Sequence, residues 1–207
     1  METNNLAIAI MAAGKGTRLK SKRPKVLHEI GGRALLLHVI AAAQKVVPSD
    51  QIYCIIGHEA DRVRAAVEST GVQFVLQSEQ RGTGHALQMV KAFFSLSGQP
   101  VPENLLVLSG DVPLIRPETI AAIRDTHIRE HAAMTILTAV TPDPTGYGRV
   151  LRATPGRPEV TAIIEQKSLK PDQLDTPEIN SGIYCFRTSA LFEKLDLSIY
   201  EGERVGF

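Results

Sequence analysis

Short apolar runs alternate with longer segments of helical period along the first two thirds of the chain, and this alternation restricts the possible folds most strongly. A run such as 105–108 is apolar at consecutive positions, which is typical of strands buried on both faces of a parallel sheet. Helices on both faces and right-handed crossovers then give an open, doubly wound sheet. The predicted strands are 6–11, 52–56, 72–76 and 105–108, and the predicted helices are 35–46, 60–68, 83–94 and 117–129. The pattern predicts an α/β fold with a mostly parallel sheet.

The pattern changes after a further apolar run at 134–138. The segment 142–158 is rich in proline and glycine, and short alternating strands are predicted at 150–151, 160–163 and 179–186. We therefore predict a single domain, 1–207, with a main lobe over about 1–139 and a smaller mixed-strand lobe over about 140–195. Residues 196–207 show no sustained period and are interpreted as an incomplete tail.

Charge and cysteine content narrow the classes of partner. The 207 residues include 23 basic and 22 acidic side chains, so a net charge of +1 provides no global field for nucleic acid or an anionic membrane. Cys54 and Cys185 each lie within an apolar run, which is typical of reduced, buried cysteine. No run approaches 18 consecutive apolar residues, and no basic segment begins the chain. We expect a cytoplasmic protein without a membrane or nucleic-acid partner.

A small, basic, glycine-rich turn follows the first predicted strand. Ala12, Ala13, Gly14 and Gly16 leave backbone N–H groups uncovered, and positive charge is supplied by Lys15, Arg18 and Lys25. Uncovered N–H groups with cations nearby are typical of phosphate sites. The turn lacks the third glycine of a dinucleotide fingerprint and the Gly-Lys-Ser/Thr of a P-loop. An ordinary strand–helix connection remains the alternative.

A carboxylate follows the strand at 105–108. Asp111 stands beside Gly110, and a lone carboxylate at a strand end suits Mg²⁺, which commonly takes one or two carboxylates together with substrate phosphate oxygens. The alternative is a turn or helix-capping aspartate.

A third polar segment runs from Gln77 through Gly82 and Thr83, where a strand ends and a helix begins. The Gln77 amide offers a donor and an acceptor to the edge of a uracil-like ring, and the Gly82–Thr83 backbone allows close approach. Capping by Thr83 explains the segment equally well.

Taken together, the motifs resemble those of the sugar-1-phosphate nucleotidylyltransferases, nearest to the branch that transfers uridylyl groups to N-acetylglucosamine-1-phosphate. The resemblance runs from about residue 6 to 195. It is carried by 11–18 with 24–27, Gln77 with 82–86, 110–114, 143–149, 164–165 and 179–184.

The resemblance implies a Rossmann-like fold, UTP and N-acetylglucosamine-1-phosphate as substrates, Mg²⁺ as cofactor, and a role in making a cell-wall precursor. It implies catalytic roles for Arg18 and Lys25 and metal binding by Asp111. The implied nucleotide contacts are Met11, Ala12, Ala13, Gly14, Lys25, Gln77, Gly82, Thr83, Gly110 and Asp111, and the implied sugar contacts are Gly148, Glu165 and Asn180.

The chemistry of the implied reaction requires no general base. The sugar phosphate would attack the α-phosphorus of UTP and expel pyrophosphate, and a phosphate monoester with a second pKa of about 6 is already ionised at neutral pH. The six histidines are therefore interpreted as structural.

The chain also departs from the family pattern. In the relatives, a second metal-binding residue, an acetyltransferase site and trimer contacts lie in elements that this sequence does not contain, so we expect impaired activity and leave the oligomeric state open. Two other hypotheses stay open: a nucleotidylyltransferase for another nucleotide or acceptor, and a nucleotide-sugar binding fragment that is catalytically incomplete.

Overall fold

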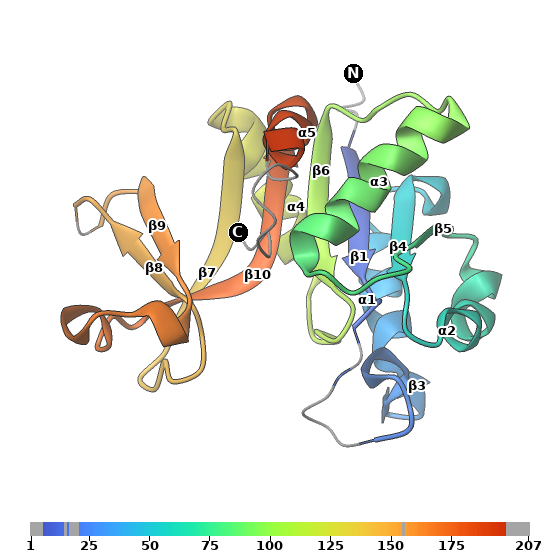
Figure 1. The fold of residues 1–207 in the computed structure, drawn as a ribbon, viewed down its shortest axis with the longest axis horizontal. Coiled ribbons are helices and arrows are strands. Elements are labelled where there is room, and N and C mark those ends of the chain that lie inside the picture. The colour runs from blue at the N-terminus through green and yellow to red at the C-terminus, as the bar shows by residue number, and fades with distance from the viewer. Residues whose placement is uncertain (1–5, 15, 17–20, 155, 198–207) are drawn as a thin grey trace. The chain divides into compact units, whose positions relative to one another are not determined.

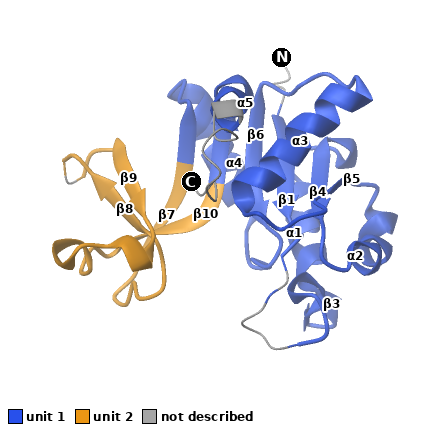
Figure 2. Cartoon of the chain, viewed as in Figure 1, with its two compact units in different colours: residues 1–135, 184–207 blue, residues 136–183 orange. Residues whose placement is uncertain are grey.

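The computed structural model describes residues 6–14, 16, 21–154 and 156–197. For residues 196 and 197 it describes the backbone only. The chain forms two compact units (Figure 2): unit 1 comprises residues 1–135 and 184–207, and unit 2 comprises residues 136–183. Within the described part, no helix is both long enough and apolar enough to span a bilayer.

A parallel sheet forms the centre of unit 1. Its strands are β1 (Leu6–Met11), β4 (Ile52–Ile56), β5 (Gln73–Leu76) and β6 (Asn104–Ser109), in the order β5-β4-β1-β6. The pairs β5–β4, β4–β1 and β1–β6 are all parallel. The last residues of β10 (Glu178–Arg187) pair antiparallel with β6, Tyr184 opposite Val107 and Arg187 opposite Asn104. The predicted doubly wound, mostly parallel sheet is confirmed.

Helices cover both faces of this sheet (Figure 1). They are α1 (Leu35–Ala43), α2 (Ala60–Val67), α3 (Thr83–Ser97), α4 (Pro117–Arg129) and α5 (Thr188–Leu197). Helices α1 and α4 contact each other behind the sheet in the view of Figure 1, whereas α3 and α5 contact each other in front of it. Consecutive apolar residues in the strands therefore meet helices on either side, and Leu105 to Leu108 are at most 1% exposed.

Shorter elements connect these layers. The strands β2 (Glu29–Ile30) and β3 (Arg33–Ala34) form a two-stranded antiparallel pair. Five 3-10 helices are described, namely η2 (Lys25–Leu27), η3 (Ser49–Gln51), η4 (Glu68–Thr70), η5 (Gln166–Ser168) and η6 (Pro171–Gln173).

Unit 2 is a small, mainly antiparallel assembly. Strand β8 (Arg149–Arg152) pairs with β9 (Val160–Ile164), and its Arg149 also pairs with Ile179 of β10. Strand β7 (Met134–Val140) pairs with β10, and the Ser181 hydroxyl donates to the Leu137 carbonyl. Unit 2 therefore consists of short strands whose described pairings at Arg149 are antiparallel.

The extent of the smaller lobe differs from the sequence-based expectation. We placed it over about 140–195, but unit 2 ends at residue 183. The reason is that β10 continues past unit 2 and pairs with β6, and α5 then packs on α3. The Gln88 amide and the Lys91 ammonium group of α3 donate to carbonyls of α5. The tail predicted for 196–207 lies outside the described residues from 198 onward.

Candidate active site

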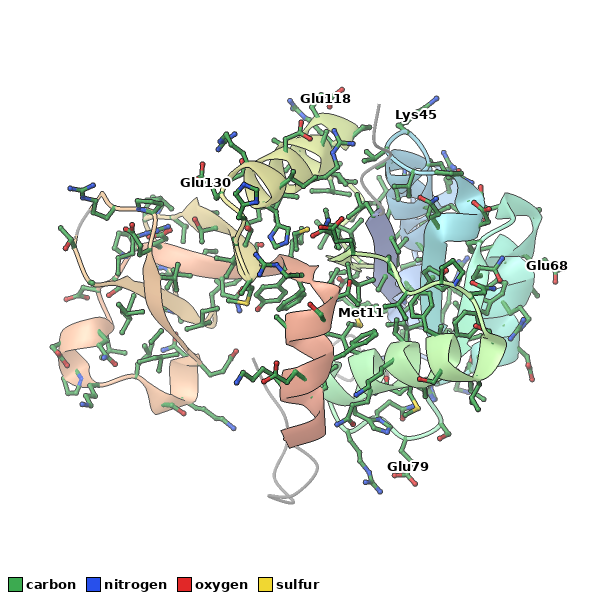
Figure 3. The ribbon with its side chains drawn as sticks, turned by 90° about the horizontal axis from the view of Figure 1, so that it is seen from above. Met11, Lys45, Glu68, Glu79, Glu118 and Glu130 are labelled. Atoms are coloured by element: carbon green, nitrogen blue, oxygen red, sulfur yellow. The ribbon has the colours of Figure 1, made fainter. Side chains whose placement is uncertain are left out.

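A pocket of about 700 Å³ opens in unit 1 where the carboxyl ends of β1, β5 and β6 meet the start of α3. This edge of a parallel sheet is the usual place for ligands. Met11, which is labelled in Figure 3, is the last residue of β1 and lines the pocket. The lining residues are Met11, Ala13, Gly14, Gly16, Lys25, Val26, Gln77, Gln80, Gly82, Thr83, Ala86, Ser109 and Asp111.

The turn after β1 is held by backbone bonds to β4 and the residues that follow it. The Ala12 N–H donates to the Ile55 carbonyl at 2.9 Å, and the His58 N–H donates to the Ala13 carbonyl at 3.2 Å. Gly14 is exposed, and a Cβ built on it would meet nothing within 4 Å. The turn is therefore anchored at its base and open where a ligand would approach. Lys15 and Arg18 lie outside the described residues.

Two glycines allow the strand ends to approach closely. A Cβ on Gly57, directly after β4, would lie 2.7 Å from the Gln77 carbonyl and 2.9 Å from the Ala13 Cβ. A Cβ on Gly110, directly after β6, would lie 2.9 Å from the Met11 carbonyl. Side chains at these positions would force apart the segments that line the pocket. The sequence analysis did not identify Gly57 as part of the site. The available signal was its position directly after the apolar run 52–56.

Lys25 and Asp111 form an ion pair inside the pocket. Lys25 starts the 3-10 helix η2, whose Val26 and Leu27 are buried and fix its position. The other carboxylate oxygen of Asp111 accepts a hydrogen bond from the Ser109 hydroxyl at 2.9 Å. The fold thus brings together Lys25 and Asp111, which are 86 positions apart in sequence (111 minus 25).

This pairing sets the charge state of the carboxylate. Burial raises the pKa of Asp111, but hydrogen bonds from Lys25 and Ser109, together with the Lys25 charge, outweigh burial and bring the pKa below its usual value of 3.8. Asp111 is thus an anion at neutral pH. Its side chain is 21% exposed, whereas that of Lys25 is 44% exposed.

Gln77 is fixed by hydrogen bonds within the pocket wall. Its side chain is buried, and the amide nitrogen lies 3.1 Å from the Gly82 carbonyl and 3.2 Å from the His85 Nδ1. Because a carbonyl only accepts, the amide NH₂ must face Gly82, and His85 Nδ1 then accepts the second proton. We expected Gln77 to offer both a donor and an acceptor to a base. Its two donor protons are instead used on Gly82 and on His85 in the first turn of α3, which leaves the carbonyl oxygen as the group available to a ligand.

The structure brings together most of the nucleotide contacts implied by sequence. Eight of the ten predicted residues line the pocket, whereas Ala12 and Gly110 do not appear in its lining. Ala12 is buried and bonded to β4, and Gly110 provides the close approach described above. The lining residues that sequence reasoning did not assign to the nucleotide are Gly16, Val26, Gln80, Ala86 and Ser109.

Gly16 has a specific reason to be glycine. Its φ is +59°, in the left-handed region, and a Cβ there would lie 2.8 Å from the Lys25 Cβ. Gly16 therefore lets the turn pack against the stem of Lys25.

In unit 2, the three predicted sugar contacts form one row across three strands. Because β8 pairs antiparallel with both β9 and β10 at Arg149, the adjacent residues Gly148, Glu165 and Asn180 fall side by side. The Asn180 N–H donates to the Gly148 carbonyl at 2.9 Å, and a Cβ on Gly148 would lie 3.4 Å from Glu165 Oε1 and 3.6 Å from Asn180 Cβ. The row thus gathers a carboxylate and an amide around a residue with no side chain.

Arg149 supports this row from the next position. The side chain is 1% exposed, and its guanidinium donates to the carbonyls of Tyr147 and Leu174. It thereby ties the loop before β8 to the segment after η6.

The donor groups of the pocket are compatible with one mode of magnesium binding. Within the described residues, no three His, Cys, Asp or Glu side chains gather closely enough to enclose a metal ion. Mg²⁺ commonly uses one or two carboxylates and completes its shell with water and substrate phosphates. A partly exposed Asp111 carboxylate fits that mode and would not by itself form a complete cage.

Comparison with known proteins agrees with this architecture. A family model described as MobA-like NTP transferase domain matches residues 8–170. The bifunctional protein GlmU of Koribacter versatilis is 58% identical over 198 residues, which make up 95% of this chain and 41% of the relative. GlmU of a Cyanothece strain is 48% identical over 191 residues, again 41% of its length. The chain therefore spans about two fifths of the length of these relatives.

Solved structures share the fold at low sequence identity. CMP:2-keto-3-deoxy-manno-octonic acid synthetase in complex with CTP has a TM-score of 0.68 at 19% identity, covering 93% of this chain and 78% of that chain. HddC from Yersinia pseudotuberculosis, complexed with GMP-PN, has a TM-score of 0.67 at 20% identity, covering 88% and 77%. With the family match over most of its length, the chain belongs to the MobA-like NTP transferase domain family and is a nucleotidyltransferase.

Proposed function

We propose that this chain transfers a uridylyl group from UTP to N-acetylglucosamine-1-phosphate and releases pyrophosphate. The observation that carries the proposal is the meeting of Lys25 and Asp111 in a pocket beside the open turn at Gly14. A lysine cation beside an open glycine turn suits a triphosphate, and the carboxylate suits a metal ion that binds with the triphosphate. The choice of uridylyl transfer is supported by the GlmU relatives.

The proposed reaction places its developing charge on phosphoryl oxygens. The sugar phosphate is an ionised nucleophile at neutral pH, so the chain's task is to orient both substrates and stabilise charge. Lys25 would hold the phosphates, and we assign the same role to Arg18, which lies outside the described residues. Asp111 would hold Mg²⁺, which when bound neutralises charge on the triphosphate.

The remaining contacts are assigned by chemistry. The Gln77 carbonyl oxygen and the Gly82–Thr83 backbone would receive the uracil. The Glu165 carboxylate and the Asn180 amide would bind the hydroxyl and acetamido groups of the sugar, with Gly148 leaving room for the ring. We further propose a cytoplasmic location and no nucleic-acid or membrane partner.

Pyrophosphate release from UTP, N-acetylglucosamine-1-phosphate and Mg²⁺ tests the proposal. Asp111→Asn should lower kcat by at least about 100-fold, the scale of losing one charge-stabilising group. Asp125→Asn, at an exposed position on α4, removes the same charge and should leave turnover unchanged. Full activity of Asp111→Asn would contradict the assignment of that residue.

A variant in unit 2 tests the sugar assignment separately. Alanine at Gly148 would make only ordinary contacts with Glu165 and Asn180, so the protein should fold normally. A methyl group in the middle of the row should raise KM for the sugar phosphate and leave KM for UTP unchanged. Equal changes in both constants would contradict the proposed division of substrates.

A second candidate is transfer of another nucleotide, which is favoured by the fold shared with proteins solved with CTP and GMP-PN. Competing CTP, GTP and dTTP in the same assay separates the two candidates. Calorimetric binding of UTP without turnover would instead identify a nucleotide-binding module that is catalytically incomplete.

A further inference from the structure

Both oxygens of the Asp111 carboxylate have partners within the protein. One oxygen accepts from the Ser109 hydroxyl, and the other is paired with the Lys25 ammonium group. The two donors differ in how far their side chains can swing. Ser109 is the last residue of β6 and is fixed by the sheet, whereas Lys25 carries its charge on a flexible stem that is 44% exposed.

Lys25 therefore acts as an internal cation at the position where a metal would bind. An ammonium group paired with this oxygen and a divalent cation coordinated to it would repel each other strongly at contact distance. A metal ion that binds without nucleotide must therefore displace Lys25 from Asp111. The displaced ammonium group finds no second carboxylate, because Asp111 is the only acidic residue in the described lining of the pocket. The anionic phosphate oxygens of a nucleotide would give the ammonium group a new partner.

We infer that Lys25 is an exchangeable stand-in for the metal ion, so that nucleotide and divalent cation promote each other's binding. The triphosphate attracts Lys25 away from Asp111, which frees the carboxylate oxygen for the cation. In the reverse direction, a cation on Asp111 releases Lys25 to the phosphates. Thermodynamic linkage requires the coupling to be equal in both directions. This inference rests on the proposed function only in naming the nucleotide.

Binding of Mn²⁺ to the protein without nucleotide tests whether Lys25 competes with a divalent cation for Asp111. Lys25→Met keeps the aliphatic stem that packs against Gly16 and removes the charge, so it should bind Mn²⁺ about tenfold more tightly than the unaltered protein. Lys45→Met removes the same charge at an exposed position after α1, and should leave the affinity within about twofold. Water-proton relaxation or calorimetry measures both.

Binding of UTP without metal, in EDTA, tests whether Asp111 competes with the phosphates for Lys25. Asp111→Asn should free Lys25 and increase the affinity for UTP about tenfold, whereas Asp125→Asn should leave it within about twofold. Circular dichroism spectra and melting temperatures of all four variants check that each is folded.

The outcomes distinguish this inference from the proposed function. If Lys25→Met gains no Mn²⁺ affinity over the Lys45→Met control, the inference is wrong, even where pyrophosphate release proceeds as proposed. If the gain is seen but no transfer occurs with any sugar phosphate, the exchange stands and the uridylyltransferase assignment is wrong. Unchanged UTP affinity in Asp111→Asn would overturn the statement that Asp111 competes with the phosphates for Lys25.

Discussion

Replacing Gly57 with alanine tests whether the pocket depends on the close approach of three strand ends. The added methyl group would lie 2.7 Å from the Gln77 carbonyl oxygen and 2.9 Å from the Ala13 Cβ, both inside the 3.0 Å limit that real Cβ atoms respect. A backbone atom and a short side chain cannot turn aside, so the segments themselves must shift. Overpacking of this kind costs about 1–3 kcal/mol.

A smaller effect acts in the opposite direction. The φ of Gly57 is not in the left-handed region, so alanine can adopt this conformation. Alanine also lowers the conformational entropy of the unfolded chain, which stabilises the folded protein by about 0.4–1 kcal/mol. We therefore expect a net loss of about 1–2 kcal/mol in the free energy of unfolding. For a chain of this size that corresponds to a Tm lowered by about 2–8 °C.

Gly14→Ala is the matched control for this experiment. Gly14 also lines the pocket and also lacks a left-handed φ, but an added Cβ would meet nothing within 4 Å. Thermal unfolding followed by far-UV circular dichroism, without ligand, should show Gly14→Ala melting at or slightly above the unaltered protein. The reasoning is refuted if Gly57→Ala and Gly14→Ala have the same Tm.

Three further predictions concern charge and burial. Because the folded-state pKa of Asp111 is depressed, its stabilising contribution is present above pH 3.8 and is lost as the pH falls through the lower folded value; urea unfolding between pH 2 and 7 should therefore show a weaker acid dependence in Asp111→Asn. Arg152→Met should lower the stability of unit 2 by about 1–3 kcal/mol, because the half-buried Glu178 loses its two hydrogen bonds from Arg152, at 2.8 and 2.5 Å, and proteolysis within residues 136–183 should become faster. Burial raises the pKa of Cys54 and of Cys185 to about 12, so neither thiol should react with iodoacetamide at pH 8 until urea unfolds the protein; rapid labelling of the native chain would contradict their burial.

Local sequence pattern was sufficient for the four parallel strands and for helices α1 to α4 of unit 1. The segment 117–129 was predicted as a helix and is α4 with those bounds, because a proline at its first position and a helical apolar period both act within a few residues. The strand at 105–108 was predicted from consecutive apolar residues and is β6 with one further residue at each end. In both cases the signal and the structure involve the same short stretch of chain.

The return of the chain from unit 2 to unit 1 was not predicted from the sequence. The run at 179–186 was recognised as a strand, but its pairing with β6 depends on which strand edge is vacant. The helix α5 was not predicted, and it packs on α3, where the Lys91 ammonium group donates to the carbonyl of Phe192, 101 positions away in sequence. Strand order and helix docking are decided by burial of whole surfaces, which local propensity does not encode.

The candidate site divides in the same way. The sequence by itself determined which residue types were available: an open glycine turn, a cation at position 25, a carboxylate at 111 and a polar set at 148, 165 and 180. Only the tertiary structure decided that Lys25 and Asp111 pair, that the Gln77 donors are used within the pocket wall, and that Gly148, Glu165 and Asn180 share one row. The physical reason is that hydrogen-bond partners and strand register are long-range properties, which are fixed when the sheet assembles and the glycines let its ends meet.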